Sequence, residues 1–203
     1  MIVIIDYGMG NLRSISKAFE RLNIKSLISA KKEDIDNADK LILPGVGHFG
    51  NGMKNLHDLD IIEILLKKVT LDKAPILGIC LGLQLFTKFS EEGNVEGLGL
   101  IDGETKRFDF IDKSDNLKVP HMGWNTAQIK KENKLFDFSI EELYYFVHSY
   151  HITCNDKNDI LASTTYGYEF TSGIQKDNVY GTQFHPEKSH SAGLKILKNF
   201  SCI

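Results

Sequence analysis

The sequence lacks long hydrophobic runs, a secretory leader and an excess of basic residues, and each of these absences excludes a class of protein. Its longest apolar runs, such as Ile2–Ile5, end far short of the roughly 20 residues needed to span a bilayer. No basic segment followed by a long apolar segment stands at the N-terminus, so a secretory signal is not expected. The 24 Lys and Arg residues against 27 Asp and Glu give a net charge of −3, which argues against nucleic acid as a partner.

Cysteines are also few, and their spacing excludes a disulfide scaffold. Cys80, Cys154 and Cys202 are widely separated and form no CxxC pair. The seven histidines show no metal-ligand spacing such as HExxH, so we expect no metal site and no cofactor. These features predict a reduced, cytoplasmic protein in which a notable cysteine acts as a thiol.

The first half of the chain alternates short apolar runs with segments of helical periodicity. A length of 203 residues is that of one domain, and we expect a single unit over residues 1–203. The pattern predicts strands at 2–5, 41–43 and 76–79 and helices at 12–22, 60–69 and 83–89, with Asn11 as the N-cap of the first helix. Continuous apolar strands between helices indicate an α/β fold whose mostly parallel sheet is covered on both faces.

After Gly97 the pattern changes. Short segments separated by turn signals predict added antiparallel strands at 144–147, 161–166 and 179–184. Helical spacing returns over residues 191–200, which predicts a closing helix.

The segment Gly78–Gly82, with the sequence GICLG, lies where a buried strand turns into a helix. This is the pattern of a nucleophile elbow with Cys80 in place of serine. Glycines are needed there because a tight strand-to-helix turn leaves no room for neighbouring side chains, and free N–H groups of the following turn favour a thiolate. The alternative reading makes Cys80 a small, inert core residue.

A thiolate nucleophile needs a base, and His185 is the best placed of the histidines. It follows the predicted strand at 179–184, and Pro186 biases it towards extended geometry. Residues two apart in an extended segment point the same way, so Glu187 is expected to orient the imidazole. If residues 185–187 are considered alone, the competing interpretation is that His185 and Glu187 lie on a surface loop.

Two glycine-rich turns could serve a ligand. Pro44–Gly47 follows the strand at 41–43, at the same sheet edge as Cys80, and its backbone N–H groups, with that of Leu81, are candidate oxyanion donors. An ordinary strand-to-helix turn is the alternative there. Gly8 and Gly10 suggest a dinucleotide site only weakly, because Arg13 stands where the fingerprint needs a third glycine.

Six ordered blocks together resemble the class I (triad-type) glutamine amidotransferase family, and within it the glutaminase subunits of imidazole glycerol phosphate synthases. The blocks, given by their residue numbers, are 6–11, 44–47, 90–93, 120–125, 146–150 and 185–189, and they accompany the segment 78–84. The resemblance implies a flavodoxin-like three-layer fold, with Cys80 as nucleophile, His185 as base and acid, and Glu187 as its orienting carboxylate.

By the same resemblance, further residues receive roles. Gln84 and Glu92 would hold the substrate L-glutamine, and Gly45, Val46, Gly47 and Leu81 would form the oxyanion hole, with a peptide at Val46 that reorients on activation. The resemblance implies a (β/α)8-barrel cyclase as partner in a heterodimer, receiving ammonia for histidine biosynthesis. The positions near that interface would be Asn11, Trp124, Tyr150 and Lys188. His48 follows Gly47 where the family commonly has a small residue, which leaves the behaviour of this loop open.

Two other functions remain open from the sequence. A paralogue with the same glutaminase site could supply ammonia for amidination of a surface-polysaccharide or nucleotide-linked sugar. A non-catalytic binding module is the alternative of another class, and the intact set of Cys80, His185 and Glu187 argues against it.

Overall fold

The computed structural model describes residues 1–110, 117–137 and 142–203. Within these ranges one sheet has the strand order β2-β1-β3-β4-β14-β13-β11-β7-β5-β6. Strand β12 branches from β13 and pairs in turn with β9, and β8 pairs separately with β10. The strands are β1 (Ile2–Ile5), β2 (Ser26–Ser29), β3 (Lys40–Leu43), β4 (Ile76–Ile79), β5 (Phe89–Ser90), β6 (Val95–Glu96), β7 (Gly103–Arg107), β8 (His121–Thr126), β9 (Gln128–Ile129), β10 (Leu143–His148), β11 (Tyr150–Cys154), β12 (Ile160–Tyr166), β13 (Tyr168–Lys176) and β14 (Val179–Thr182). No helix in the described ranges is long and apolar enough to cross a membrane.

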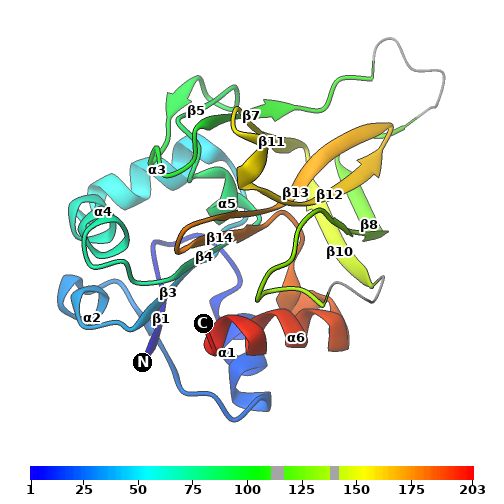
Figure 1. Ribbon diagram of the computed structural model, residues 1–203. Coiled ribbons are helices and arrows are strands. Elements are labelled where there is room, and N and C mark those ends of the chain that lie inside the picture. Colours follow the sequence, from blue (N-terminus) through cyan, green and yellow to red (C-terminus); the bar gives the residue numbers. More distant parts are fainter. Residues whose placement is uncertain (111–116, 138–141) are drawn as a thin grey trace.

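Helices cover both faces of the parallel part of the sheet (Figure 1). They are α1 (Leu12–Arg21), α2 (Lys32–Asp36), α3 (Phe49–Asp58), α4 (Ile62–Thr70), α5 (Leu81–Gln84) and α6 (His190–Ser201), with short 3-10 turns η1 (Lys157–Asp159) and η2 (Pro186–Lys188). Alternate residues of β1 face opposite ways, as expected for a strand. Ile2 and Ile4 join the core cluster that contains α1 and α6, whereas Val3 and Ile5 join the cluster that contains α3 and α4.

The sheet confirms the predicted division of the chain into a parallel first half and antiparallel additions. Strands β2, β1, β3 and β4 pair in parallel, and most later strands pair in antiparallel fashion. Strand β14 belongs to both parts: it is antiparallel to β13, as predicted, but parallel to β4. This pairing brings the end of β14 beside the end of β4, which positions the residues that follow each strand.

Helix α5 is shorter than the helix predicted at 83–89, because its carbonyl groups find other partners. The Thr87 hydroxyl donates to the carbonyl oxygen of Gln84, and the backbone N–H of Leu98 donates to that of Leu85. These bonds end the helix after one turn and lead the chain into β5. Asn11 does stand at the N-cap position of α1, but its side chain makes no capping hydrogen bond.

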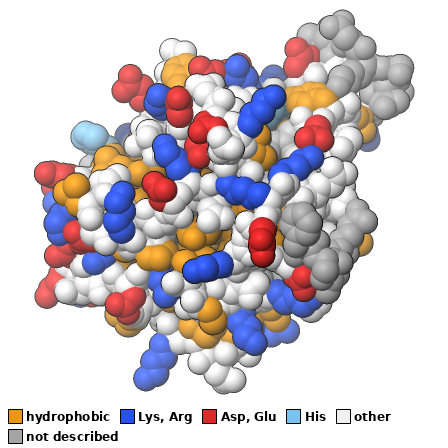
Figure 2. All heavy atoms as spheres, viewed as in Figure 1, with side chains coloured by type: hydrophobic (Ala, Val, Ile, Leu, Met, Phe, Trp, Pro, Cys, Tyr) orange, Lys and Arg blue, Asp and Glu red, His pale blue; other side chains and the backbone are white. Residues whose placement is uncertain are grey.

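Acidic and basic side chains are interspersed over the face shown in Figure 2, in keeping with the small net charge. This distribution agrees with the absence of any basic excess in the sequence.

Candidate active site

Cys80 occupies the turn between β4 and α5 in a strained backbone conformation. Its φ is +54° and its ψ is −109°, in the region that L-residues rarely adopt. A Cβ at Gly78 would lie 2.6 Å from the ring of Phe86, and one at Gly82 would lie 1.8 Å from the carbonyl oxygen of Leu43. Both positions therefore require glycine, because neighbouring atoms leave no room for a Cβ. This is the steric reason that the sequence pattern suggested.

His185 and Glu187 form a buried pair immediately beyond β14. The Nδ1 atom of His185 lies 2.9 Å from Oε1 of Glu187, and each side chain is only 2% exposed. The two side chains meet as predicted, but the backbone between them does not have the predicted extended conformation. Residues 186–188 form the 3-10 turn η2 instead. Since a carboxylate only accepts, it selects the tautomer with the proton on Nδ1.

The pKa of His185 depends on its two neighbours, Cys80 and Glu187. Burial lowers the pKa of His185, but attraction to the Cys80 thiolate and then to Glu187 outweighs burial and raises this pKa to about 10. The Nε2 atom of His185 is buried and has no hydrogen-bond partner among the described residues. The raised pKa favours the imidazolium form of His185 near the Cys80 sulfur.

One cavity of about 370 Å³ collects most of the predicted site residues. Its lining includes Cys80 and Leu81 from the elbow, Val46 and Gly47 from the following loop of β3, and Gln84 and Glu92. The remaining lining residues come from the segment around β8, β10 and β11: Pro120, Val147, His148, Ser149 and Tyr150. His185 and Glu187 are not among the residues that line this cavity.

The loop at 44–47 does not present an open set of oxyanion donors. The backbone N–H of Leu81 donates to the carbonyl oxygen of Gly45 over 3.4 Å, so one predicted donor is occupied. The hydroxyl of Tyr7 donates to the carbonyl oxygen of Pro44 at 2.5 Å and holds the loop from beneath. A Cβ at Gly45 would lie 2.6 Å from this hydroxyl oxygen, which explains the glycine.

Glu92 ties the cavity to helix α3. Its Oε2 accepts a hydrogen bond from the backbone N–H of Phe49 at 2.7 Å, and Nδ1 of His48 accepts one from Gly50 at 3.1 Å. Both side chains thus satisfy donors at the N-terminus of α3. His48, whose effect the sequence left open, acts as a helix cap and does not line the cavity.

The four residues predicted near the partner interface lie in different parts of the structure. Trp124 and Lys188 lie in an exposed cluster: the Trp124 ring stacks on His190 at 5.0 Å, and both Trp124 and the Lys188 ammonium group contact the ring of Tyr145. Tyr150 lines the cavity instead. Asn11 is exposed at the start of α1, which packs against η2.

Gln183 and His148 are residues of this site that the sequence did not single out. The Nε2 atom of Gln183 donates to the Cys80 sulfur over 3.7 Å. Gln183 stands two residues before His185, so the alternation argument applied to Glu187 would have found it. His148 lies within the block 146–150, but neither periodicity nor spacing assigned it a role.

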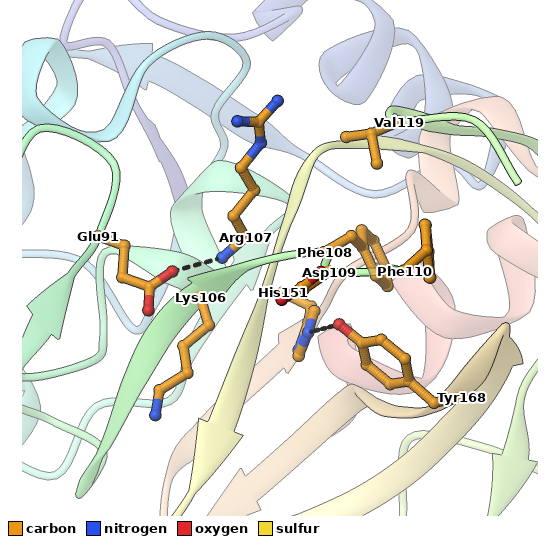
Figure 3. A pocket seen from close by; sticks show the side chains of 9 residues that line it. All are labelled: Glu91, Lys106, Arg107, Phe108, Asp109, Phe110, Val119, His151 and Tyr168. Atoms are coloured by element: carbon orange, nitrogen blue, oxygen red, sulfur yellow. Dashed lines mark hydrogen bonds between the residues drawn. The ribbon is translucent and has the colours of Figure 1, made fainter. Parts of the chain in front are cut away.

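A larger cavity, of about 880 Å³, lies in a different place (Figure 3). Its lining carries charged side chains, such as Glu91, Lys106 and Arg107, and aromatic ones around Phe108, and His151 there bonds the Tyr168 hydroxyl at 2.8 Å. No cysteine is among the described residues that line it, so they do not supply the thiol that the predicted chemistry needs.

The glycines at the end of β1 have a structural explanation. A Cβ at Gly10 would lie 3.1 Å from Pro44 and 3.2 Å from the backbone nitrogen of Gly45. Gly10 therefore allows the first loop to pack against the loop at 44–47, with no need of a nucleotide.

Comparison with known proteins agrees with this geometry. The family model described as "Glutamine amidotransferase class-I" matches residues 3–202. A Methanococcus maripaludis protein named imidazole glycerol phosphate synthase subunit HisH 2 is 52% identical over 201 residues, covering 98% of each chain. A second protein of the same strain, named subunit HisH 1, is 48% identical over 206 residues, again covering 98% of each.

Among solved structures, one titled "Crystal structure of glutamine amidotransferase" superposes with a TM-score of 0.75 at 18% identity. It covers 99% of this chain and 100% of the other. At that identity the likeness establishes the fold alone. The family model and the two relatives extend over nearly the whole sequence, and the chain belongs to the class-I glutamine amidotransferase family.

Proposed function

We propose that this chain is the glutaminase subunit of an imidazole glycerol phosphate synthase. In this role it hydrolyses L-glutamine to glutamate and ammonia and passes the ammonia to a (β/α)8-barrel cyclase in histidine biosynthesis. The observation that carries the proposal is Cys80 on the wall of a cavity with Gln84 and Glu92, backed by the buried His185–Glu187 pair. The three free cysteines agree with a cytoplasmic setting.

The reaction begins when the thiolate of Cys80 attacks the side-chain carbonyl carbon of glutamine. A C–S bond forms, and the carbonyl π electrons move to the oxygen. The imidazolium of His185 then gives its Nε2 proton to the amide nitrogen, and the C–N bond breaks as the carbonyl double bond forms again. Ammonia departs, and a γ-glutamyl thioester remains on the sulfur. The raised pKa of His185 suits this first step, because the residue enters it as an acid.

Hydrolysis of the thioester reverses these roles. Neutral His185 takes a proton from water, the hydroxide attacks the thioester carbonyl, and glutamate leaves as the thiolate is restored. Glu187 holds the imidazole with the proton on Nδ1 throughout, and its charge stabilises each imidazolium state.

The oxyanion that forms in both steps needs donors, and the loop at 44–47 must change to supply them. We infer that the Leu81 N–H becomes available when its bond to the Gly45 carbonyl is broken, with a peptide at Val46 or Gly47 turning its N–H into the cavity. A bond of 3.4 Å is long for this donor and acceptor, so breaking it costs little. The chain alone should therefore be a slow glutaminase.

The exposed cluster of Trp124, Lys188, Tyr145 and His190, with Met122 at 63% exposure, is the proposed contact with the cyclase. Its link to the site runs through β10. The backbone N–H of Tyr145 donates to the Ser189 hydroxyl oxygen at 3.0 Å, and the N–H of His185 donates to the Tyr145 carbonyl oxygen at 2.9 Å. A partner that presses on this cluster therefore acts directly on the backbone that carries His185.

Steady-state glutamate release, measured with and without a cyclase subunit, tests the proposal. We expect slow release by the chain alone, a large increase with the cyclase and its ligand, and no release by Cys80→Ala in either case. The Cys80→Ala complex should still use free ammonia. Equal fast rates with and without the cyclase would refute the coupling.

A second destination for the ammonia is supported by one observation. Two similar chains of one Methanococcus maripaludis strain carry the same subunit name, so such subunits occur in duplicate. A duplicate that supplies ammonia for amidination of a surface-polysaccharide or nucleotide-linked sugar would keep the same glutaminase site. Deletion in the source organism separates the two: histidine auxotrophy supports the first function, and prototrophy with an altered glycan supports the second.

A further inference from the structure

We propose that Gln183 stabilises the thiolate of Cys80, and that a fixed chain of hydrogen bonds aims its amide N–H at the sulfur. The inference rests on the proposed function, because it concerns the nucleophile of that reaction. Gln183 would be a further residue, besides the triad of Cys80, His185 and Glu187, that acts on the reacting sulfur atom.

The polarity of the chain is set by a backbone carbonyl group. The Tyr150 carbonyl oxygen can only accept, so the atom of Gln84 that lies 2.9 Å from it is the amide nitrogen. The second hydrogen of this nitrogen points to Oε1 of Gln183 at 3.1 Å. With its oxygen held there, Gln183 turns its own nitrogen to the Cys80 sulfur, 3.7 Å away.

A second bond to the Tyr150 carbonyl oxygen strengthens this assignment. Nδ1 of His148 lies 2.7 Å from it and must carry the proton. Burial lowers the pKa of His148 well below its usual value, so the ring stays neutral and this geometry does not change near neutral pH. The carbonyl thus orders two buried side chains at once.

Backbone pairing places Gln183 and Cys80 side by side. Thr182 is in register with Ile79 in the parallel pair of β14 and β4, and the N–H of Cys80 donates to the Thr182 carbonyl oxygen at 2.8 Å. The N–H of Gln183 is in turn bound to the Ser172 carbonyl oxygen at 2.9 Å. Gln183 is fully buried, so its amide position is as fixed as that of the sheet.

A donor at this place favours the charged sulfur. A hydrogen bond to the charged form of a group stabilises that form, and the effect is stronger in a buried site of low dielectric constant. The carbonyl oxygen of Val147, 3.9 Å from the sulfur, acts in the other direction because it accepts from the thiol. Gln183 offsets this carbonyl group, and His185 adds its charge.

The other titratable groups that face the sulfur do not replace Gln183. The hydroxyl of Tyr7 donates to the Pro44 carbonyl oxygen, and its pKa is raised by burial and by the Cys80 thiolate, so it stays neutral. Glu92 lies on the same cavity wall and is bound to the Phe49 N–H. These groups and His185 remain the same in every variant below, so a difference between variants reports on Gln183.

The test compares alkylation of Cys80 by iodoacetamide at pH 7 and at pH 9.5, followed on the peptide that contains residue 80 by mass spectrometry. Gln183→Met keeps the length of the side chain and removes the donor, and Gln183→Glu replaces the donor by a negative charge. Gln175→Met, at a half-buried glutamine of β13 outside the cavity, is the matched control. Glutamate release by the complex with the cyclase is measured on the same proteins.

We expect alkylation at pH 7 to fall about tenfold in Gln183→Met and further in Gln183→Glu, because a hydrogen bond to a charged group is worth roughly one factor of ten or more. At pH 9.5, above the ordinary pKa of a cysteine thiol, Gln183→Met should approach the wild-type rate. In glutamate release, kcat should fall with little change in KM.

An equal loss at both pH values would mean that Gln183 only shapes the pocket, and an unchanged rate at pH 7 would mean that it does not support the thiolate. Either result overturns the inference while leaving the glutaminase proposal intact. Wild-type protein without glutaminase activity but with the expected alkylation pattern would overturn the proposed function and leave this inference standing.

Discussion

Replacement of Cys80 by glycine should give a more stable protein than replacement by alanine, the reverse of the usual order. Both variants remove the sulfur, so the comparison isolates the Cβ atom at a φ of +54° and a ψ of −109°. A non-glycine residue in such a conformation costs about 1–3 kcal/mol, which glycine avoids. Glycine loses about 0.5–1 kcal/mol more backbone entropy on folding than alanine does. The balance favours Cys80→Gly by about 1 kcal/mol.

Urea denaturation followed by circular dichroism measures this difference, and thermal unfolding should show a midpoint about 2–4 °C higher for Cys80→Gly in a chain of this length. The matched control is the pair Lys17→Ala and Lys17→Gly at an exposed position of α1, where alanine should be the more stable by about 1 kcal/mol. If Cys80→Gly is the less stable variant by the same amount as Lys17→Gly, the turn stores no strain at the nucleophile and the reasoning fails.

Two further predictions concern stability. Gly82→Ala should destabilise the fold by about 3 kcal/mol or more in urea, because its Cβ would lie 1.8 Å from the Leu43 carbonyl oxygen and backbone would have to move; a loss below 1 kcal/mol would contradict this packing. Burial lowers the pKa of His121 from 6.5 to about 4, so its contribution to stability is complete above pH 6.5 and is lost as the pH falls towards 4. From pH 7 to pH 5 the free energy of unfolding should fall by about 1–2 kcal/mol on this account, and His121→Asn should remove that part of the decrease; an unchanged slope in the variant would show that His121 does not cause it.

Much of the parallel core could be predicted because its signals are local. Continuous apolar runs locate β1, β3 and β4, and helical periodicity locates α1, α4 and α6 to within one or two residues. The nucleophile elbow was predictable for a steric reason, since only glycine fits at 78 and 82. These features depend on neighbours a few residues away in the sequence.

The features that sequence reasoning missed depend on distant partners. Helix α3 contains glycines at 50 and 52, which disfavour a helix, and its first turn is stabilised by Glu92, more than 40 residues later. The bond between the Leu81 N–H and the Gly45 carbonyl group, which occupies a predicted oxyanion donor, is a property of two packed loops. The contact of Gln183 with the sulfur likewise exists only because β14 lies beside β4.

The most direct measurement of the central claim is covalent labelling of the chain, in complex with a cyclase, by a diazoketone analogue of glutamine. Mass spectrometry of the digested protein should find the label on Cys80 alone, with labelling prevented by excess glutamine. Cys154, which is partly buried, and the exposed Cys202 are internal controls, because they are the other free thiols of the chain. A label on Cys202 with Cys80 untouched, or labelling of Cys80 that glutamine does not slow, would contradict the account.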